Sequence, residues 1–161
     1  MSASEKTSRA LVEEVVRSFG KVRLCVLGTS MAPSVLPGDL ISIQRAELDE
    51  ISSGEIVLFS RDERLFVHRV VSRDAARETP CLVTRGDRLG HEDPPVTAAE
   101  LLGRVTSIER GHRRFEPDNR VRGWNRLILR VLRASDLATR AYLHFLARAR
   151  NFFPPQTECR P

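Results

Sequence analysis

The stretch LGTSMAPSVLPGDLISI, residues 27–43, sets a Thr-Ser-Met triplet between a hydrophobic run and a turn rich in proline and glycine. Directly after the turn, apolar and polar residues alternate, as in a β-strand with one buried face. Ser, Pro, Gly and Asp are ordinary turn formers, so the stretch fits a polar loop that joins two strands. It also fits a loop, stiffened by Pro33 and Pro37, that holds Ser30 as a nucleophile.

Short apolar segments on both sides of this stretch predict a small, mainly β, mostly antiparallel domain. They are rich in Val, Ile, Leu and Phe and are separated by Pro, Gly, Asp or Ser. Along the chain they are VRLCVLG, DLISIQR, EIVLFSR, RLFVHRVVSR, CLVTRG and LLGRVTSIER. The charged residues 61–64 indicate a hairpin tip. The segment VTAAELLG, residues 96–103, is compatible with a short helix that has Thr97 as its N-cap.

Helical patterns flank this β domain on both sides. Apolar residues recur three and four positions apart between about Glu5 and Phe19, and Gly20 ends the pattern. After residue 120 a broad apolar stripe returns with most arginines off it, which predicts a basic amphipathic helix. The expected organisation is an N-terminal helix at 1–20, a β domain at 21–116, and a basic amphipathic helix with a tail at 117–161.

The chain is long enough for one folded core, and its positive charge is concentrated near the C-terminus. Between residues 110 and 150, eleven arginines and three acids give a local balance of +8, whereas the whole chain is +5. Such a helix could contact an anionic membrane surface, or it could pack on the β domain or on a second subunit. Nucleic acid is a weaker option, because no known reading module accompanies the arginines.

Compartment and cofactor expectations follow from what these patterns lack. No uncharged apolar run approaches the roughly 20 residues that span a bilayer. The N-terminal segment contains Glu5, Glu13 and Glu14 and has no continuous apolar centre, so it is a poor secretory signal. We therefore expect a cytoplasmic protein, peripheral on the inner membrane face if the basic helix binds lipid. The cysteines form no Cys-x-x-Cys pair, and no histidine pair has ligand spacing, so we expect no metal and no cofactor.

A nucleophilic serine requires a base that takes its proton and a donor that holds the oxyanion. Lys6 and Lys21 are the only lysines and both precede Ser30, which excludes a lysine base on a later strand. His68 lies within RLFVHRVVS, where strand geometry fixes its direction. A single strand histidine is more often structural than catalytic. Surface positions fit the other three histidines better; these are His91, His112 and His144. Of the three, His91 could also support a catalytic residue.

Carboxylates that could orient a histidine are gathered in one loop, TRGDRLGHEDPP, residues 84–95. Asp87, Glu92 and Asp93 could each hold an imidazole and favour its charged form. The loop could equally be an acidic turn stiffened by its two prolines, and spacing alone does not distinguish these cases. Cys25 is a weaker candidate nucleophile, because its place inside the apolar run VRLCVL favours a core strand position.

These blocks, in this order, resemble type I signal peptidases and the wider S24/S26 superfamily that includes LexA-type self-cleaving repressors. GTSMAPSVLPGDLISI resembles the nucleophile box, and SSGEIVLFSRDERLFVHRVVS resembles the block whose second strand bears the general base. VTRGDRLGHEDP is similar to the later Gly-Asp box, and LLGRVTSI to the closing strand. The resemblance covers roughly Gly28 to Ile108, about half of the chain.

The resemblance implies a serine endopeptidase that cleaves a peptide or protein precursor, with residues 21–116 as the peptidase-like domain. It makes Ser30 the nucleophile and His68 the base, as in the archaeal and endoplasmic-reticulum branch, where the bacterial branch has lysine. Asp93 is the first choice for the carboxylate partner and Asp87 the second. The backbone N–H of Ser30 would help to hold the oxyanion. Family behaviour also implies small substrate residues before the scissile bond.

Two departures from the family separate this chain from its best-known members. The charged first helix cannot be the hydrophobic anchor of a signal peptidase, and the roughly 20 residues before the β domain are too few for a repressor's helix-turn-helix. An alternative function is therefore a catalytically inactive module of the same fold that binds an extended peptide along a strand edge.

Overall fold

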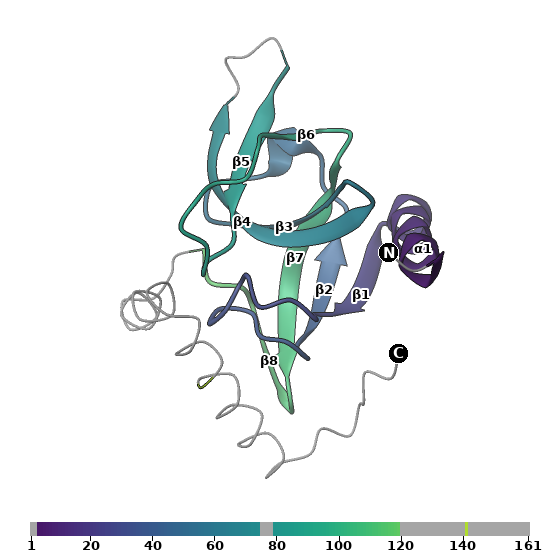
Figure 1. The fold of residues 1–161 in the computed structure, drawn as a ribbon, viewed down its shortest axis with the longest axis vertical. Coiled ribbons are helices and arrows are strands. Elements are labelled where there is room, and N and C mark those ends of the chain that lie inside the picture. Colours follow the sequence, from purple (N-terminus) through teal and green to yellow (C-terminus); the bar gives the residue numbers. More distant parts are fainter. Residues whose placement is uncertain (1–2, 75–78, 120–140, 142–161) are drawn as a thin grey trace.

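The computed structural model describes residues 3–74, 79–119 and 141, and in this part of the chain it consists of one helix followed by a single β-sheet (Figure 1). The helix α1 spans Ala3–Phe19, and a 3₁₀ turn spans Leu48–Glu50. The strands are β1 (Lys21–Cys25), β2 (Leu40–Gln44), β3 (Ile56–Arg61), β4 (Arg64–Asp74), β5 (Cys81–Arg85), β6 (Val96–Thr97), β7 (Leu101–Arg110) and β8 (Arg113–Phe115). The predicted mainly antiparallel β fold with an N-terminal helix is confirmed. The basic helix expected at 117–161 falls almost entirely outside the described residues.

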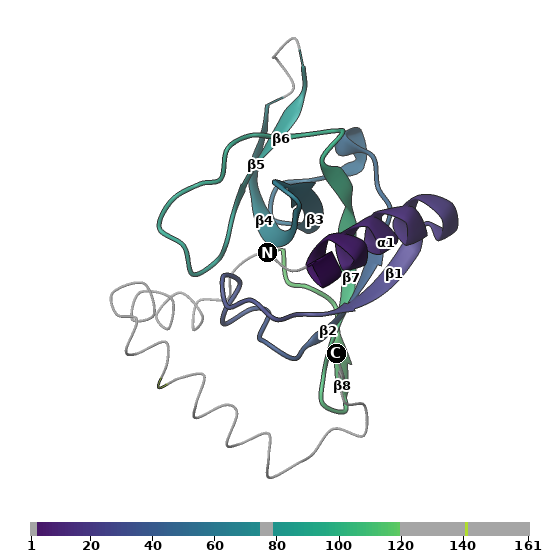
Figure 2. The same ribbon diagram turned by 45° about the vertical axis from the view of Figure 1, so that its right-hand side comes forward.

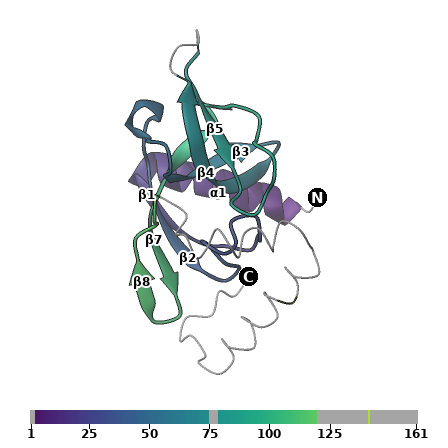
Figure 3. The ribbon, with the colours of Figure 1, turned by 90° about the vertical axis from the view of Figure 1, so that its left-hand side faces the viewer.

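All strand pairs in the sheet are antiparallel, in the order β1-β2-β7-β3-β4-β5-β6, with β8 also paired to β7. The sheet is strongly curled: the β3–β4 hairpin crosses the direction of β2 and β7, and the β7–β8 hairpin projects beyond the rest (Figures 1 and 3). The predicted hairpin tip is confirmed, because Asp62 and Glu63 both take positive φ between β3 and β4. Val57 of β3 pairs with His68 of β4, and Val70 of β4 pairs with Thr84 of β5. The middle of β4 therefore lies between β3 and the end of β5.

The helix α1 packs beside β1 and contacts β4 and β7 as well (Figure 2). Val16 is its anchor in the core, with 1% of its surface exposed. Gly20 ends the helix in the left-handed region at φ 69°, and its N–H donates to the carbonyl of Val16. In the described part of the chain, no helix combines the length and the apolar character that crossing a membrane requires.

The core divides into two apolar clusters on opposite faces of β4, as strand alternation predicts. Val67 packs on the first cluster, and Phe66 packs on the second, which also contains Val70. The largest fully buried side chains of the first cluster are Met31, Ile41, Ile43, Ile56, Leu58 and Ile108. The alternation therefore also fixes the face on which His68 lies.

The short helix expected at 96–103 is wrong. Val96 and Thr97 instead form β6 against β5, a turn follows, and β7 begins at Leu101. The signal that favoured a helix is real but local: the Thr97 N–H donates to the Glu100 carboxylate, which is one half of a helix capping box. The Thr97 hydroxyl donates to the same carboxylate, and the Glu100 N–H donates to the Thr97 carbonyl. Leu101 and Leu102 are buried in the sheet, which ends the turn before a helix can form.

Candidate active site

Ser30 lies on a loop whose two ends are tied together. The Val26 N–H donates to the carbonyl of Asp39 over 2.9 Å, and the Gly38 N–H donates to the carbonyl of Val26 over 2.6 Å. Within the loop, Met31 and Val35 are buried in the core. The loop is therefore closed at its base and anchored at its centre, and Ser30 stands on a supported turn.

Asp39 fixes this loop to the sheet from below. Its carboxylate has no exposed surface and pairs with Arg110 of β7, with Nη2 at 2.7 Å from Oδ2. It also accepts the Leu36 N–H over 2.8 Å, while Arg110 donates to the carbonyl of Ser34 over 3.1 Å. A buried carboxylate is costly unless it is paired in this way. The acid of the Pro-Gly-Asp turn thus holds the loop in place.

His68 points toward Ser30 from the middle of β4. Its Nε2 lies 3.0 Å from Oγ of Ser30, which is hydrogen-bond distance. The residue is 3% exposed, and its ring contacts those of Phe59 and Phe66, with centroids 6.0 and 5.9 Å away. These aromatic contacts restrict the rotation of the imidazole. Both of its nitrogens, Nδ1 and Nε2, remain accessible to polar partners.

Asp93 is the partner on the second nitrogen of His68. Its Oδ2 lies 2.6 Å from Nδ1 and also accepts the hydroxyl of Thr84 over 2.7 Å. The Asp93 N–H donates to the Thr84 carbonyl over 2.8 Å, so loop and strand are joined twice. Because an ionised carboxylate only accepts hydrogen bonds, Nδ1–H is the donor to Asp93, and in the neutral imidazole this places the lone pair of Nε2 toward the Ser30 hydroxyl.

Asp87 has a different partner. Its two oxygens accept Nε and Nη2 of Arg69 over 2.8 and 2.9 Å, and both side chains are buried. Arg69 also donates to the carbonyls of Gly54 and Asp118. Of the two carboxylates predicted for His68, the structure brings Asp93 to the imidazole and places Asp87 in an ion pair that holds the loop to β4.

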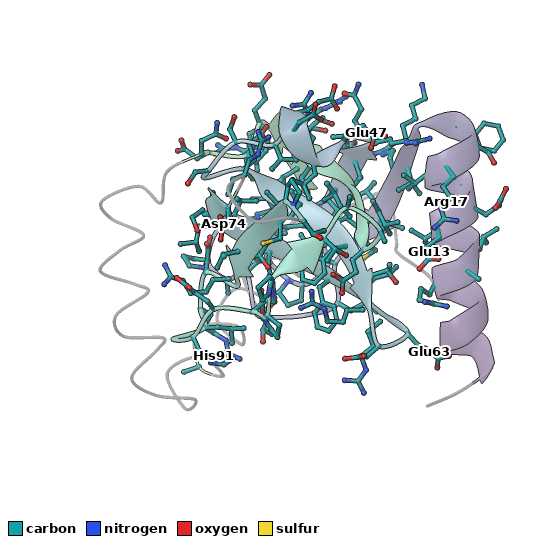
Figure 4. All side chains as sticks on the ribbon, turned by 90° about the horizontal axis from the view of Figure 1, so that it is seen from above. Glu13, Arg17, Glu47, Glu63, Asp74 and His91 are labelled. Carbon is teal, nitrogen blue, oxygen red and sulfur yellow. The ribbon has the colours of Figure 1, made fainter. Side chains whose placement is uncertain are left out.

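The remaining candidates are not brought to this cluster. Glu92 is exposed, and His91 is exposed at the periphery of the molecule (Figure 4). His112 is exposed near the tip of the β7–β8 hairpin, whereas His144 lies outside the described residues. Cys25 is the last residue of β1, which confirms its predicted strand position, but its side chain is only partly buried and is not part of the core.

The loop that carries Ser30 contacts the loop at residues 86–93, and this contact was not predicted from the sequence. The Arg88 N–H donates to the carbonyl of Ser30 over 2.9 Å, and a Cβ on Gly86 would lie 2.9 Å from the same oxygen. Only a residue without a side chain allows this close approach. The Gly-Asp pair in the quoted box was the available signal, whereas nothing in the sequence singled out Thr84.

The Peptidase S24-like family model matches residues 4–88, more than half of the chain. The chain belongs to the Peptidase S24-like family. The predicted S24/S26 superfamily is thereby confirmed, and with it a fold of the serine-peptidase type. A search of the curated proteins finds no match. The S24-like match contains both Ser30 and His68 and ends before Asp93.

Within this S24-like domain, the geometry can support proton transfer from the Ser30 hydroxyl to the imidazole of His68. Lys21 is exposed at the start of β1. Among residues 3–74, 79–119 and 141, no group of three or more His, Cys, Asp and Glu side chains is arranged to hold a metal ion. Ser30 and His68 line a cavity of about 580 Å³. Acyl transfer by a serine requires this arrangement of a hydroxyl, an imidazole and a carboxylate.

Proposed function

We propose that this S24-like protein is a serine endopeptidase of the Ser/His branch that cleaves a peptide or protein precursor. Ser30 is the nucleophile, His68 the general base and Asp93 the carboxylate that orients the base. One observation carries the proposal: hydrogen-bond distances run without a gap from Oγ of Ser30 through both nitrogens of His68 to Asp93. This is the geometric requirement for an activated serine.

The reaction follows from the proton positions. Oγ of Ser30 attacks the carbonyl carbon of the scissile bond while Nε2 of His68 takes the hydroxyl proton. The C–N bond then breaks, Nε2 returns that proton to the leaving amine, and an ester joins Ser30 to the acyl fragment. A water molecule, deprotonated by Nε2 of His68, then attacks the ester carbonyl; the bond between Oγ and the acyl carbon breaks, Nε2 returns the proton to Oγ of Ser30, and the acid is released. Asp93 stabilises the charged imidazole through Nδ1–H in both halves.

The backbone N–H of Ser30 is the first candidate for holding the oxyanion. Gly28, two residues earlier, offers no side-chain donor. Loss of one oxyanion donor in a serine hydrolase lowers the rate about 10²–10³-fold. The bonds that tie Gly38 and Asp39 to Val26 keep the orientation of this loop constant, which favours the reaction by reducing the freedom lost on binding.

Labelling with a fluorophosphonate probe tests the proposal directly, because the probe reacts with an activated serine and needs no peptide substrate. We expect the wild-type chain to form an adduct on Ser30, detected by mass spectrometry of tryptic peptides. Ser30→Ala and His68→Ala should abolish labelling while their thermal unfolding stays close to wild type. Ser72→Ala, which removes an exposed hydroxyl on β4, is the matched control and should label normally. Undiminished labelling of Ser30→Ala would end the proposal.

The catalytically inactive peptide-binding module is the alternative. It predicts that peptides bind the wild-type chain, Ser30→Ala and His68→Ala with equal affinity, and that Ser30 stays unlabelled. The fully connected Ser30–His68–Asp93 chain favours the peptidase, because a binding function alone has no need for an imidazole held between a hydroxyl and a carboxylate.

A further inference from the structure

The segment 93–96, which carries the Asp93 carboxylate, lacks backbone donors in its middle. At its start the Asp93 N–H donates to the carbonyl of Thr84 over 2.8 Å, and its end enters strand β6. Between these two points lie Pro94 and Pro95, which have no N–H group. The middle of the segment can therefore be held only through its carbonyl oxygens or by packing of its side chains.

Arg61, the last residue of β3, donates hydrogen bonds to both proline carbonyls. Its Nη1 lies 2.9 Å from the carbonyl oxygen of Pro94, and its Nη2 lies 2.8 Å from that of Pro95. A guanidinium presents its N–H donors in one rigid plane, so it can bind two neighbouring acceptors at once. These two hydrogen bonds fix the backbone directly after Asp93.

Glu100 in turn fixes the direction of this guanidinium. Its Oε1 lies 2.6 Å from Nε of Arg61, and its Oε2 lies 3.0 Å from Nη2. The Thr97 N–H donates to the same carboxylate, and the Ser60 N–H donates to the Glu100 carbonyl over 2.9 Å. Bidentate pairs of arginine and carboxylate add geometric specificity to their energy. The guanidinium of Arg61 is therefore already directed toward the proline carbonyls in the protein without substrate.

Arg61 also contacts an aromatic ring that lies beside the imidazole. Phe59 precedes Arg61 by two residues on β3, so both side chains lie on one face of the strand. The guanidinium carbon is 5.5 Å from the centroid of the Phe59 ring, which is cation–π distance. The Phe59 ring is itself 6.0 Å from the ring of His68, between centroids. One guanidinium thus contacts both the backbone after Asp93 and a neighbour of the imidazole.

We infer that Arg61, directed by Glu100, is a positioning residue that keeps the Asp93 carboxylate on Nδ1 of His68. The inference rests on the proposed function, because it assigns how the same site is held in its active arrangement. Arg61 acts through the main chain after Asp93 and takes no part in the proton transfer itself. Without the guanidinium, the carboxylate can move away from Nδ1, and a displacement of about 1 Å at such a group can cost about 10²-fold in rate.

Steady-state kinetics of Arg61→Met provides the first test. The variant loses the guanidinium but keeps an unbranched side chain at this position. We expect kcat to fall about 10–100-fold while KM stays nearly constant, because the substrate does not contact Arg61 in the proposed reaction. Arg64→Met makes the same change at the exposed position paired with Arg61 on β4, and it should keep the wild-type kcat. An unchanged kcat in Arg61→Met overturns the inference and leaves the peptidase function, tested by labelling of Ser30, intact.

A double variant separates positioning from a loss of stability. Arg61→Met alone leaves the Glu100 carboxylate without its cation, so the fold is also destabilised. Arg61→Met combined with Glu100→Gln removes both charges, and we expect Tm to return toward the wild-type value while kcat stays low. If kcat recovers together with Tm, the pair serves stability alone, which contradicts the inference.

The tautomer of His68 tests the inference independently of catalysis. Long-range proton–nitrogen NMR spectra of protein with isotope-labelled histidine measure how the proton of the neutral ring is divided between Nδ1 and Nε2. We expect it on Nδ1 in the wild type and in Arg64→Met, with a measurable fraction on Nε2 in Arg61→Met. This result supports the inference even if the wild-type chain cleaves no peptide, in which case only the proposed function fails. The same distribution in Arg61→Met and the wild type overturns the inference.

Discussion

The hydroxyl of Thr84 lies 2.7 Å from Oδ2 of Asp93, the same oxygen that accepts Nδ1–H of His68. Two donors on one oxygen hold the carboxylate against rotation. Thr84 has no exposed surface, so water cannot easily replace its hydroxyl. Thr84 therefore acts as a positioning residue for Asp93, and through it for the imidazole.

Thr84→Val is expected to lower kcat on the order of tenfold with little change in KM, because the carboxylate that orients His68 loses one of its two restraints. Steady-state kinetics on a single peptide measures both parameters. Thr84→Ser keeps the hydroxyl and should retain most of kcat. If Thr84→Ser and Thr84→Val reduce kcat equally, kcat depends on the methyl group of Thr84 and not on its hydrogen bond.

Asp93→Asn and Asp87→Asn should have opposite signatures. Asp93→Asn is expected to lower kcat by about 10³–10⁴-fold with a small change in stability, because an amide cannot hold the catalytic tautomer of His68. Asp87→Asn leaves the buried Arg69 without its carboxylate, which costs about 3–5 kcal/mol of folding free energy.

Thermal unfolding and single-peptide kinetics distinguish the two variants. The Asp87 change should lower Tm on the order of 10 °C, and the Asp93 change should leave Tm nearly unaltered. A lower kcat in Asp87→Asn than in Asp93→Asn, at a temperature where both are folded, would reverse our assignment of the two carboxylates.

Gly86→Ala is expected to reduce kcat by about 10²-fold, because displacements on the ångström scale at a reacting group are costly. The new Cβ would stand 2.9 Å from the Ser30 carbonyl and 3.0 Å from the Leu89 side chain, so the serine loop must shift. Gly90→Ala, in the same loop, meets nothing within 4 Å and is the control that should stay active. Comparable activity of both variants would show that the loop tolerates the added atom.

Acid should weaken the fold through Glu100. Hydrogen bonds from Arg61 lower the pKa of this carboxyl from 4.5 to about 2, against the opposing effect of partial burial, and Thr97 adds to the lowering. Since the folded-state pKa lies below the unfolded one, ionised Glu100 stabilises the fold above pH 4.5. That contribution is lost as the pH falls from about 4.5 to about 2.

Urea unfolding between about pH 2 and 7 of the wild type and Glu100→Gln measures this effect. At neutral pH the variant should be less stable by on the order of 1–2 kcal/mol, after allowance for the partial exposure of the pair. The difference should shrink toward about pH 2, where the wild-type carboxyl becomes protonated. A difference that stays constant over the whole range would contradict the role of the Arg61 pair.

Most of the sheet and the N-terminal helix could be predicted, because local periodicity carries the information. Alternation in RLFVHRVVS places Phe66 and His68 on one face, and the structure agrees. The strand β8 was not predicted, since RRF has no apolar alternation and is held by pairing with β7. The turn at Thr97 led to the wrong prediction of a helix for the opposite reason. Its local capping signal is genuine, but the residues from Leu101 onward form strand β7.

Spacing alone could not distinguish the two carboxylates, although the family resemblance ranked Asp93 before Asp87. Asp87 and Asp93 lie in one loop, and their order along the chain does not say which reaches the imidazole. The pairing of β4 with β5 determines which carboxylate reaches the imidazole. Asp87 forms an ion pair with Arg69, and Asp93 contacts His68. Thr84 had no sequence signal at all, as a buried threonine on a strand is ordinary.

The loop from Gly86 to Asp93 contacts Ser30 at one end and the imidazole of His68 at the other. Its crest, Gly90 to Glu92, is exposed. An antibody fragment that binds residues 90–92 and shifts this loop would displace both Ser30 and the Asp93 carboxylate. It would not compete with a substrate for the cavity beside them. Such a reagent should lower kcat while leaving KM unchanged, which offers a route to inhibition from outside the substrate path.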